Sequence, residues 1–148
     1  MEGLSSSDIK NIVEKIRGSV IFFANFEASE LIEILKASTI KKVKNGEIIF
    51  KKDEPGDEMY IIVYGSVSIS KGGRELAKLG PGACFGEMGI IDRFPRTADA
   101  KTVEDSLLML VSEDILDSTD MGVRLKLYKN FAHVLAQRLR ATNQEIGT

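Results

Sequence analysis

Residues 82–98 read Gly82-Ala83-Cys84-Phe85-Gly86-Glu87-Met88-Gly89-Ile90-Ile91-Asp92-Arg93-Phe94-Pro95-Arg96-Thr97-Ala98, and they interrupt the strand-like pattern on either side. The segment 85–91 predicts about one helical turn that begins after a glycine. The first backbone N–H groups of such a turn have no helical partner and point the same way, which suits an anion such as phosphate. Glycines at 86 and 89 remove side chains that would block a close approach.

An arginine and a glutamate complete this pattern. Pro95 has a fixed φ that helps to aim Arg96, whose planar guanidinium matches two phosphate oxygens. Glu87 would be repelled by a phosphate unless it faces away and accepts a hydrogen bond from a ribose hydroxyl. Together these residues predict a nucleotide site with one phosphate. The plainer alternatives are a surface Arg96 paired with Asp92 and a Glu87 that favours the helix dipole.

Working outward, residues 39–111 predict a β domain. Nine of the 13 glycines and all three prolines lie between residues 46 and 95, so the chain turns often there. Seven or eight short strands at this spacing favour a sandwich or a jelly-roll barrel. The predicted strands are 39–44, 47–51, 59–63, 66–70, 74–79, 97–103 and 106–111.

Both flanks predict helices. In residues 1–38, Ser7 would cap a first helix, a second would run from about 27 to 36, and three phenylalanines at 22, 23 and 26 would pin them to a core. In residues 112–148, Ser112 would cap one helix, and Thr119 or Asp120 would cap a longer one ending near 145. That helix has one apolar stripe, formed by Leu127, Phe131, Val134, Leu135, Leu139, Thr142 and Ile146. We expect one domain.

Composition excludes several function classes. The chain has 148 residues, 20 basic and 22 acidic, and a net charge of −2, so no overall field favours nucleic acid or membrane. One cysteine, Cys84, and one histidine, His133, exclude disulfide frameworks and multi-histidine metal sites. No membrane segment or secretory signal is visible, so the cytoplasm is the expected location. Five basic residues without an acid between 121 and 144 allow DNA binding, but no helix-turn-helix follows and nucleic acid is not favoured.

Residues 85–91 followed by Pro95-Arg96-Thr97-Ala98 resemble the phosphate-binding cassette of cyclic nucleotide-binding domains, of the catabolite activator protein and cAMP-dependent kinase regulatory subunit type. Residues in 22–31 also resemble the family's entry helix, and residues in 46–50, 56–57, 60–62 and 65–67 match its recurrent strand and turn positions. The resemblance covers roughly residues 20 to 145. The resemblance implies a β jelly roll (double-stranded β-helix) with N-terminal helices, a short cassette helix within 82–98, and a long C-terminal helix. It implies these ligand-binding residues: Phe85, Gly86, Glu87, Met88, Gly89, Arg96 and Thr97.

By the same resemblance, Glu87 binds the ribose 2′-hydroxyl and Arg96 binds the cyclic phosphate, helped by the N–H groups of Gly89 and Thr97. Two positions depart from the family. Gly89 stands where alanine or serine is usual, and Asp99 would weaken phosphate binding if it faced the pocket. In the family a threonine after the arginine goes with cGMP, although Thr97 also suits a plain strand. We favour cAMP over cGMP, because cAMP is the commoner ligand.

Three hypotheses follow. The first is a cyclic nucleotide sensor in which ligand binding repacks the C-terminal helix. This helix is also a candidate homodimer seam, and an unidentified effector protein is a further partner of the sensor. The second is a domain that kept the fold, lost the ligand and serves protein interaction or dimerisation. The third, an enzyme, is least favoured, because no nucleophile–base pair is visible; we expect no catalytic residue, metal or cofactor.

Overall fold

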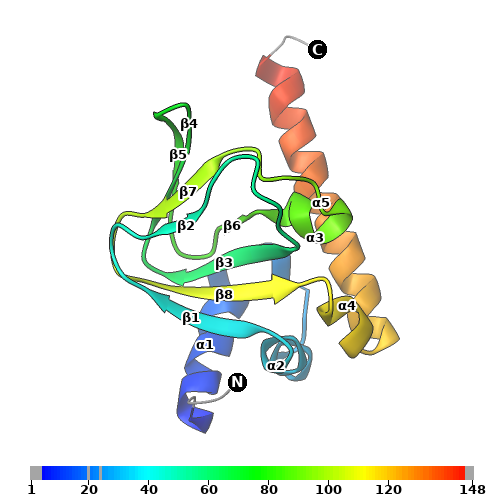
Figure 1. Cartoon of the computed structure of the whole chain (residues 1–148). Helices are drawn as coiled ribbons and strands as arrows, with labels where there is room; N and C mark the ends of the chain where they lie inside the picture. The colour runs from blue at the N-terminus through cyan, green and yellow to red at the C-terminus, as the bar shows by residue number, and fades with distance from the viewer. Residues whose placement is uncertain (1–4, 20, 24, 146–148) are drawn as a thin grey trace.

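A computed structural model describes residues 5–19, 21–23 and 25–145, so Ile146 of the predicted stripe lies outside the described residues. Helices from the two ends of the chain lie beside two β-sheets, and α5 extends beyond the strands (Figure 1). The elements are α1 (Ser6–Ser19), η1 (Ile21–Phe23), α2 (Ala28–Lys36), β1 (Thr39–Val43), β2 (Ile48–Phe50), β3 (Glu58–Tyr64), β4 (Val67–Lys71), β5 (Arg74–Leu79), β6 (Cys84–Phe85), α3 (Glu87–Asp92), β7 (Asp99–Thr102), β8 (Ser106–Ser112), α4 (Ile115–Ser118) and α5 (Met121–Glu145).

The strands form two antiparallel sheets, in the orders β1-β8-β3-β6 and β2-β7-β4-β5. The first sheet separates two hydrophobic cores, which explains the continuous apolar runs in β3 and β8. Met59 and Ile61 face a core shared with the helices, whereas Tyr60 and Ile62 face the interior between the sheets. A strand covered on both faces needs apolar side chains at every position. The predicted jelly-roll architecture is confirmed.

The N-terminal helices are held by caps and aromatic contacts. The predicted cap at Ser7 is wrong, because Ser5 accepts from the Asp8 amide at 3.1 Å and the Asp8 carboxylate accepts from the Ser5 amide at 3.0 Å. These bonds lower the pKa of Asp8. The predicted core role of the three phenylalanines is confirmed, since each is buried and the Phe22 ring lies 4.9 Å from that of Phe131 in α5.

At the C-terminal end the predicted cap at Ser112 is wrong, since Ser112 is the last residue of β8. Asp120 caps α5, because its carboxylate accepts from the Val123 amide at 2.9 Å. The single predicted stripe on this helix is also wrong. Leu127 is fully buried against the core, whereas Leu139 is 61% exposed on a different face. Within the described residues, no helix is both long enough and apolar enough to cross a membrane.

Candidate functional site

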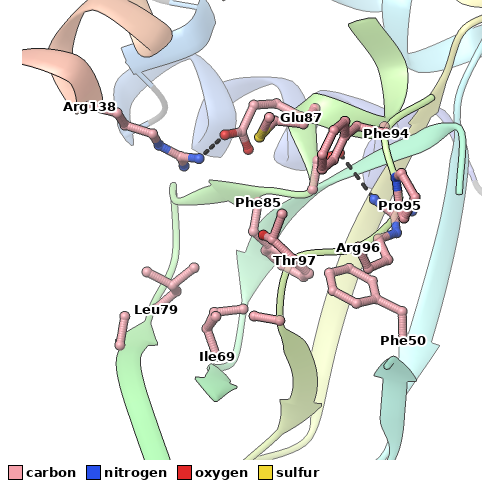
Figure 2. A pocket seen from close by; sticks show the side chains of 15 residues that line it. Phe50, Ile69, Leu79, Phe85, Glu87, Phe94, Pro95, Arg96, Thr97 and Arg138 are labelled. Atoms are coloured by element: carbon pink, nitrogen blue, oxygen red, sulfur yellow. Dashed lines mark hydrogen bonds and ion pairs between the residues drawn. The ribbon is translucent and has the colours of Figure 1, made fainter. Parts of the chain in front are cut away.

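The structure contains a cavity of about 250 Å³ between the β4–β5 hairpin, the cassette helix α3 and the distal part of α5 (Figure 2). All seven residues that the sequence predicted as ligand-binding line it. Ile69, Ala77 and Leu79 from the hairpin form an apolar wall, and the lining is completed by Phe50, Phe94, Pro95, Ala98 and Arg138. The described chain therefore brings one pocket together from segments far apart in sequence.

Arg96 is buried at the wall of this cavity, with 6% of its surface exposed. Its Nη1 donates to the Gly86 carbonyl at 3.1 Å, and its guanidinium lies 4.3 Å from the Phe50 ring centre. Its Nε has no hydrogen-bond partner in the described part of the chain. A surface pair with Asp92 is contradicted, because Asp92 instead accepts from the Phe94 amide at 3.1 Å. Burying a guanidinium with a free donor is costly unless a ligand oxygen completes it.

Glycines make room for the guanidinium. Gly86 has a φ of 77°, and a Cβ there would lie 2.7 Å from Arg96 Nη1. A Cβ on Gly89 would lie 2.7 Å from the Gly56 carbonyl oxygen. Glycine at position 89, where the family usually has alanine or serine, thus has a physical reason, because the backbone of Gly56 approaches too closely for an alanine side chain. The Gly89 amide itself donates to the Gly86 carbonyl at 3.1 Å.

Glu87 is the second buried charge of the cavity, with 2% exposure in the first turn of α3. One carboxylate oxygen, Oε1, forms an ion pair with Arg138 of α5. The other, Oε2, has no hydrogen-bond partner among the residues that the structure describes. Glu87 is therefore more than a helix-start acid on a solvated surface, since it leaves a buried acceptor beside the cavity.

Arg138 is the charged lining residue that sequence reasoning missed as a member of the site. Its Nη2 donates to the Cys84 carbonyl at 3.3 Å, while its Nη1 meets Glu87 (Figure 2). It is one of the five basic residues between 121 and 144. A signal was present, since Arg138 follows Leu127, Phe131 and Val134 at three- and four-residue steps and so continues the core-facing row.

The remaining predicted residues fall into two groups. Thr97 and Met88 line the cavity but are exposed, so a ligand can reach them without displacing other groups. Asp99 does not line it: its carboxylate accepts from the Lys52 amide at 2.7 Å. The negative charge that would have weakened phosphate binding is thus committed to a neighbouring loop.

The site supports binding better than bond-breaking chemistry. Its two buried charged groups are a cation and a carboxylate, each with one polar atom that has no partner among the described residues. Burial raises the pKa of the Cys84 thiol, which keeps it protonated and poorly nucleophilic. His133 lies on an exposed part of α5 and does not line the cavity. No metal-binding cluster of histidine, cysteine and acidic residues occurs in the described part of the chain.

Comparison with known proteins gives a consistent result. The family profile described as "Cyclic nucleotide-binding domain" matches residues 40–119. The CRP-like cAMP-activated global transcriptional regulator of Mycobacterium tuberculosis is 32% identical over 140 residues, which cover 91% of this chain and 62% of the regulator. The cyclic AMP receptor protein of Thermus thermophilus is 41% identical over 108 residues, which cover 68% of this chain and 49% of that protein.

Among solved structures, the catabolite activator protein of Thermus thermophilus superposes with a TM-score of 0.77 and 31% identity, over 85% of this chain and 61% of that chain. The chain thus spans about half to three-fifths of the length of these proteins.

Proposed function

Because this chain belongs to the cyclic nucleotide-binding domain family, we propose that its cavity binds a cyclic nucleotide and that cAMP is preferred over cGMP. One observation carries this proposal. The cavity holds a buried guanidinium and a buried carboxylate, and each keeps one polar atom without a partner among the described residues. Such atoms are costly to bury, so a ligand that satisfies both gains affinity without displacing a hydrogen bond at either atom.

A cyclic nucleotide has the groups that these atoms need. Its phosphate would accept hydrogen bonds from Arg96, whose charge lies in a low-dielectric setting beside the Phe50 ring. Its ribose 2′-hydroxyl would donate to Oε2 of Glu87, the oxygen that Arg138 does not engage. The Gly89 amide would exchange its bond to Gly86 for a phosphate oxygen.

The choice of base rests on two observations that point in different directions. Two relatives are named for cAMP, as a cAMP-activated regulator and a cyclic AMP receptor protein. Thr97 lines the cavity with its side chain exposed, so its hydroxyl is available to the amino group of guanine. We favour cAMP on the first observation, and the second requires that cGMP be measured beside it.

Coupling to α5 would run through Glu87 and Arg138. Glu87 contacts the ligand in our proposal, and its other oxygen pairs with a side chain of the long helix. A ligand that orders the Glu87 carboxylate would therefore favour one position of Arg138 and of the helix around it. The ligand shifts this equilibrium only by its differential affinity for the two positions.

The exposed face of α5 supports a homodimer. Its exposed apolar side chains recur at steps of four and three residues, which is the spacing of a coiled-coil seam. These residues are Met121, Leu125, Tyr128, Ala132, Leu135 and Leu139. We propose that two copies pair along this face.

Calorimetric titration with cAMP and with cGMP tests the proposal. We expect binding by the wild type and a loss of about 2–5 kcal/mol for Arg96→Ala, because a buried phosphate contact loses its cation. Arg93→Ala is the matched control, since Arg93 lies three residues away, is exposed and does not line the cavity. Absence of heat with both nucleotides would instead favour a domain that lost its ligand, although Asp99 does not fill the pocket as that alternative expects.

A further inference from the structure

A second groove lies between α1 and α2, which pack side by side against the first sheet (Figure 1). Its volume is about 510 Å³, and it shares no lining residue with the nucleotide cavity. It is lined by Ser6, Ile9, Lys10, Val13, Glu14, Arg17, Ala28, Ile32 and Lys36. The groove is thus a separate feature that the proposed nucleotide binding does not use.

The floor of this groove is apolar and comes equally from the two helices. Ile9 and Val13 are one turn apart on α1, and Ala28 and Ile32 are one turn apart on α2. Ile9, Ala28 and Ile32 pack on the core from outside and keep part of their surface exposed. Apolar side chains one turn apart on each of the two helices form a surface on which the apolar face of a third helix can pack.

The rim of the groove is cationic. Lys10 and Arg17 lie along α1 and Lys36 ends α2, against one acid, Glu14, among the lining residues. Arg17 also forms an ion pair with Glu27, with 3.9 Å between Arg17 Nη2 and Glu27 Oε2. Both side chains are at least half exposed, so this pair is weak and a partner's acid can replace it. The groove therefore carries positive charge in a chain whose net charge is −2. Its field attracts a partner of opposite charge.

We propose that this groove docks an amphipathic helix of a partner protein, with an apolar ridge against the floor and acidic residues along both flanks. The apolar rows match anchors at i, i+3 or i+4 and i+7 of such a helix. The acidic flanks would meet Lys10, Arg17 and Lys36. Because the groove and the nucleotide cavity share no residue, docking does not require the nucleotide, and Arg96→Ala is expected to leave it unchanged.

The test uses the full chain and two designed peptides. Both are 15-residue helices with a leucine ridge at helical spacing; one has glutamates on its flanks, and the other has lysine at each of those positions. Binding is measured by fluorescence anisotropy, and the site by amide chemical-shift changes. We expect the acidic peptide to bind at least tenfold more tightly than the basic one, with changes centred on residues 6–17 and 28–36, and with weaker binding at high salt.

Two variants make the result decisive. In Lys10→Glu/Arg17→Glu/Lys36→Glu the preference should reverse toward the basic peptide, whereas Lys71→Glu, an exposed lysine at the end of β4, should leave it unchanged. Circular dichroism melting confirms that each variant is folded. Equal binding of both peptides, binding of neither, or shift changes elsewhere would overturn the proposal. A change in the oligomeric state of the triple variant alone would also overturn it and assign the groove to a second copy of the chain.

Discussion

The two halves of α5 are built differently. The proximal half, residues 121–134, is tied to the N-terminal helices: Lys126 pairs with Glu30 at 2.6 Å, and Asn130 donates to the Phe22 carbonyl at 2.5 Å. The distal half, residues 135–145, extends past the sheets (Figure 1), and its Arg138 lines the cavity of the candidate site. The proximal half is thus part of the core, whereas the distal half is in a position to respond to a ligand.

This difference would allow one helix both to stabilise the fold and to respond to the proposed ligand. Free energy of unfolding comes from buried apolar contacts, which are concentrated in the proximal half at Val123, Leu127 and Phe131. A segment that moves on binding has to come from the less stable part of a structure. The distal half fits that requirement, because Leu139 is mostly exposed.

The largest expected effect concerns how much each half of α5 contributes to the free energy of unfolding. Phe131→Ala should lower the free energy of unfolding by about 3–5 kcal/mol, since it empties a buried position between α5 and Phe22. Leu139→Ala is the matched control and should change it by less than about 0.5 kcal/mol in the monomer. Urea unfolding at low protein concentration measures both, and similar losses would show that the halves do not differ.

The next effect concerns the contact between the distal half and the cavity. Arg138→Ala should cost about 1–3 kcal/mol, because it leaves the Glu87 carboxylate buried without a counter-charge, although Arg138 itself is half exposed. In a Glu87→Gln background the same substitution should cost little. Urea unfolding of the four proteins forms a double-mutant cycle, and equal costs in both backgrounds would mean that the pair does not hold the distal half.

The smallest effect tests the ion pair between Lys126 and Glu30 through the pH dependence of stability. The hydrogen bond from Lys126 lowers the pKa of Glu30. Because the pKa of Glu30 is lowered in the folded state, its ionised form stabilises the fold at pH values above the ordinary glutamate pKa of 4.5. This stabilisation is lost as the pH falls through the lowered pKa of the folded state. Lys126→Met should therefore cost about 0.5–1 kcal/mol at pH 7 and less near pH 3. Thermal melting across this range measures it, and a cost independent of pH would show that the charge pair is not responsible.

Much of the fold could be predicted because its signals are local. Turn residues mark the ends of strands, and the apolar runs of β3 and β8 are continuous because both faces of their sheet are covered. The short strand β6 was not separated as an element of its own, because two residues carry no periodicity. The cap positions at Ser7 and Ser112 were wrong because several neighbouring polar residues could serve, and only tertiary packing selects one.

Some residues of the candidate site could likewise be predicted from the sequence, and others could not. The cassette residues are close in sequence, so their pattern was visible, and the structure gathers them at one cavity. Arg138 lies 54 residues from Cys84, whose carbonyl it contacts, so its place on the core-facing row of α5 does not by itself say which distant segment it meets. The two faces of α5 merged into one predicted stripe because spacing alone does not say which apolar residues meet the core and which face outward.

The most direct test of coupling between the ligand and the distal half is hydrogen–deuterium exchange of α5 with and without cAMP. We expect cAMP to slow exchange in residues 135–145, to leave residues 121–134 nearly unchanged, and to change neither segment in Arg96→Ala. Binding of cAMP without a change in the distal half, or with equal protection of both halves, would contradict this coupling.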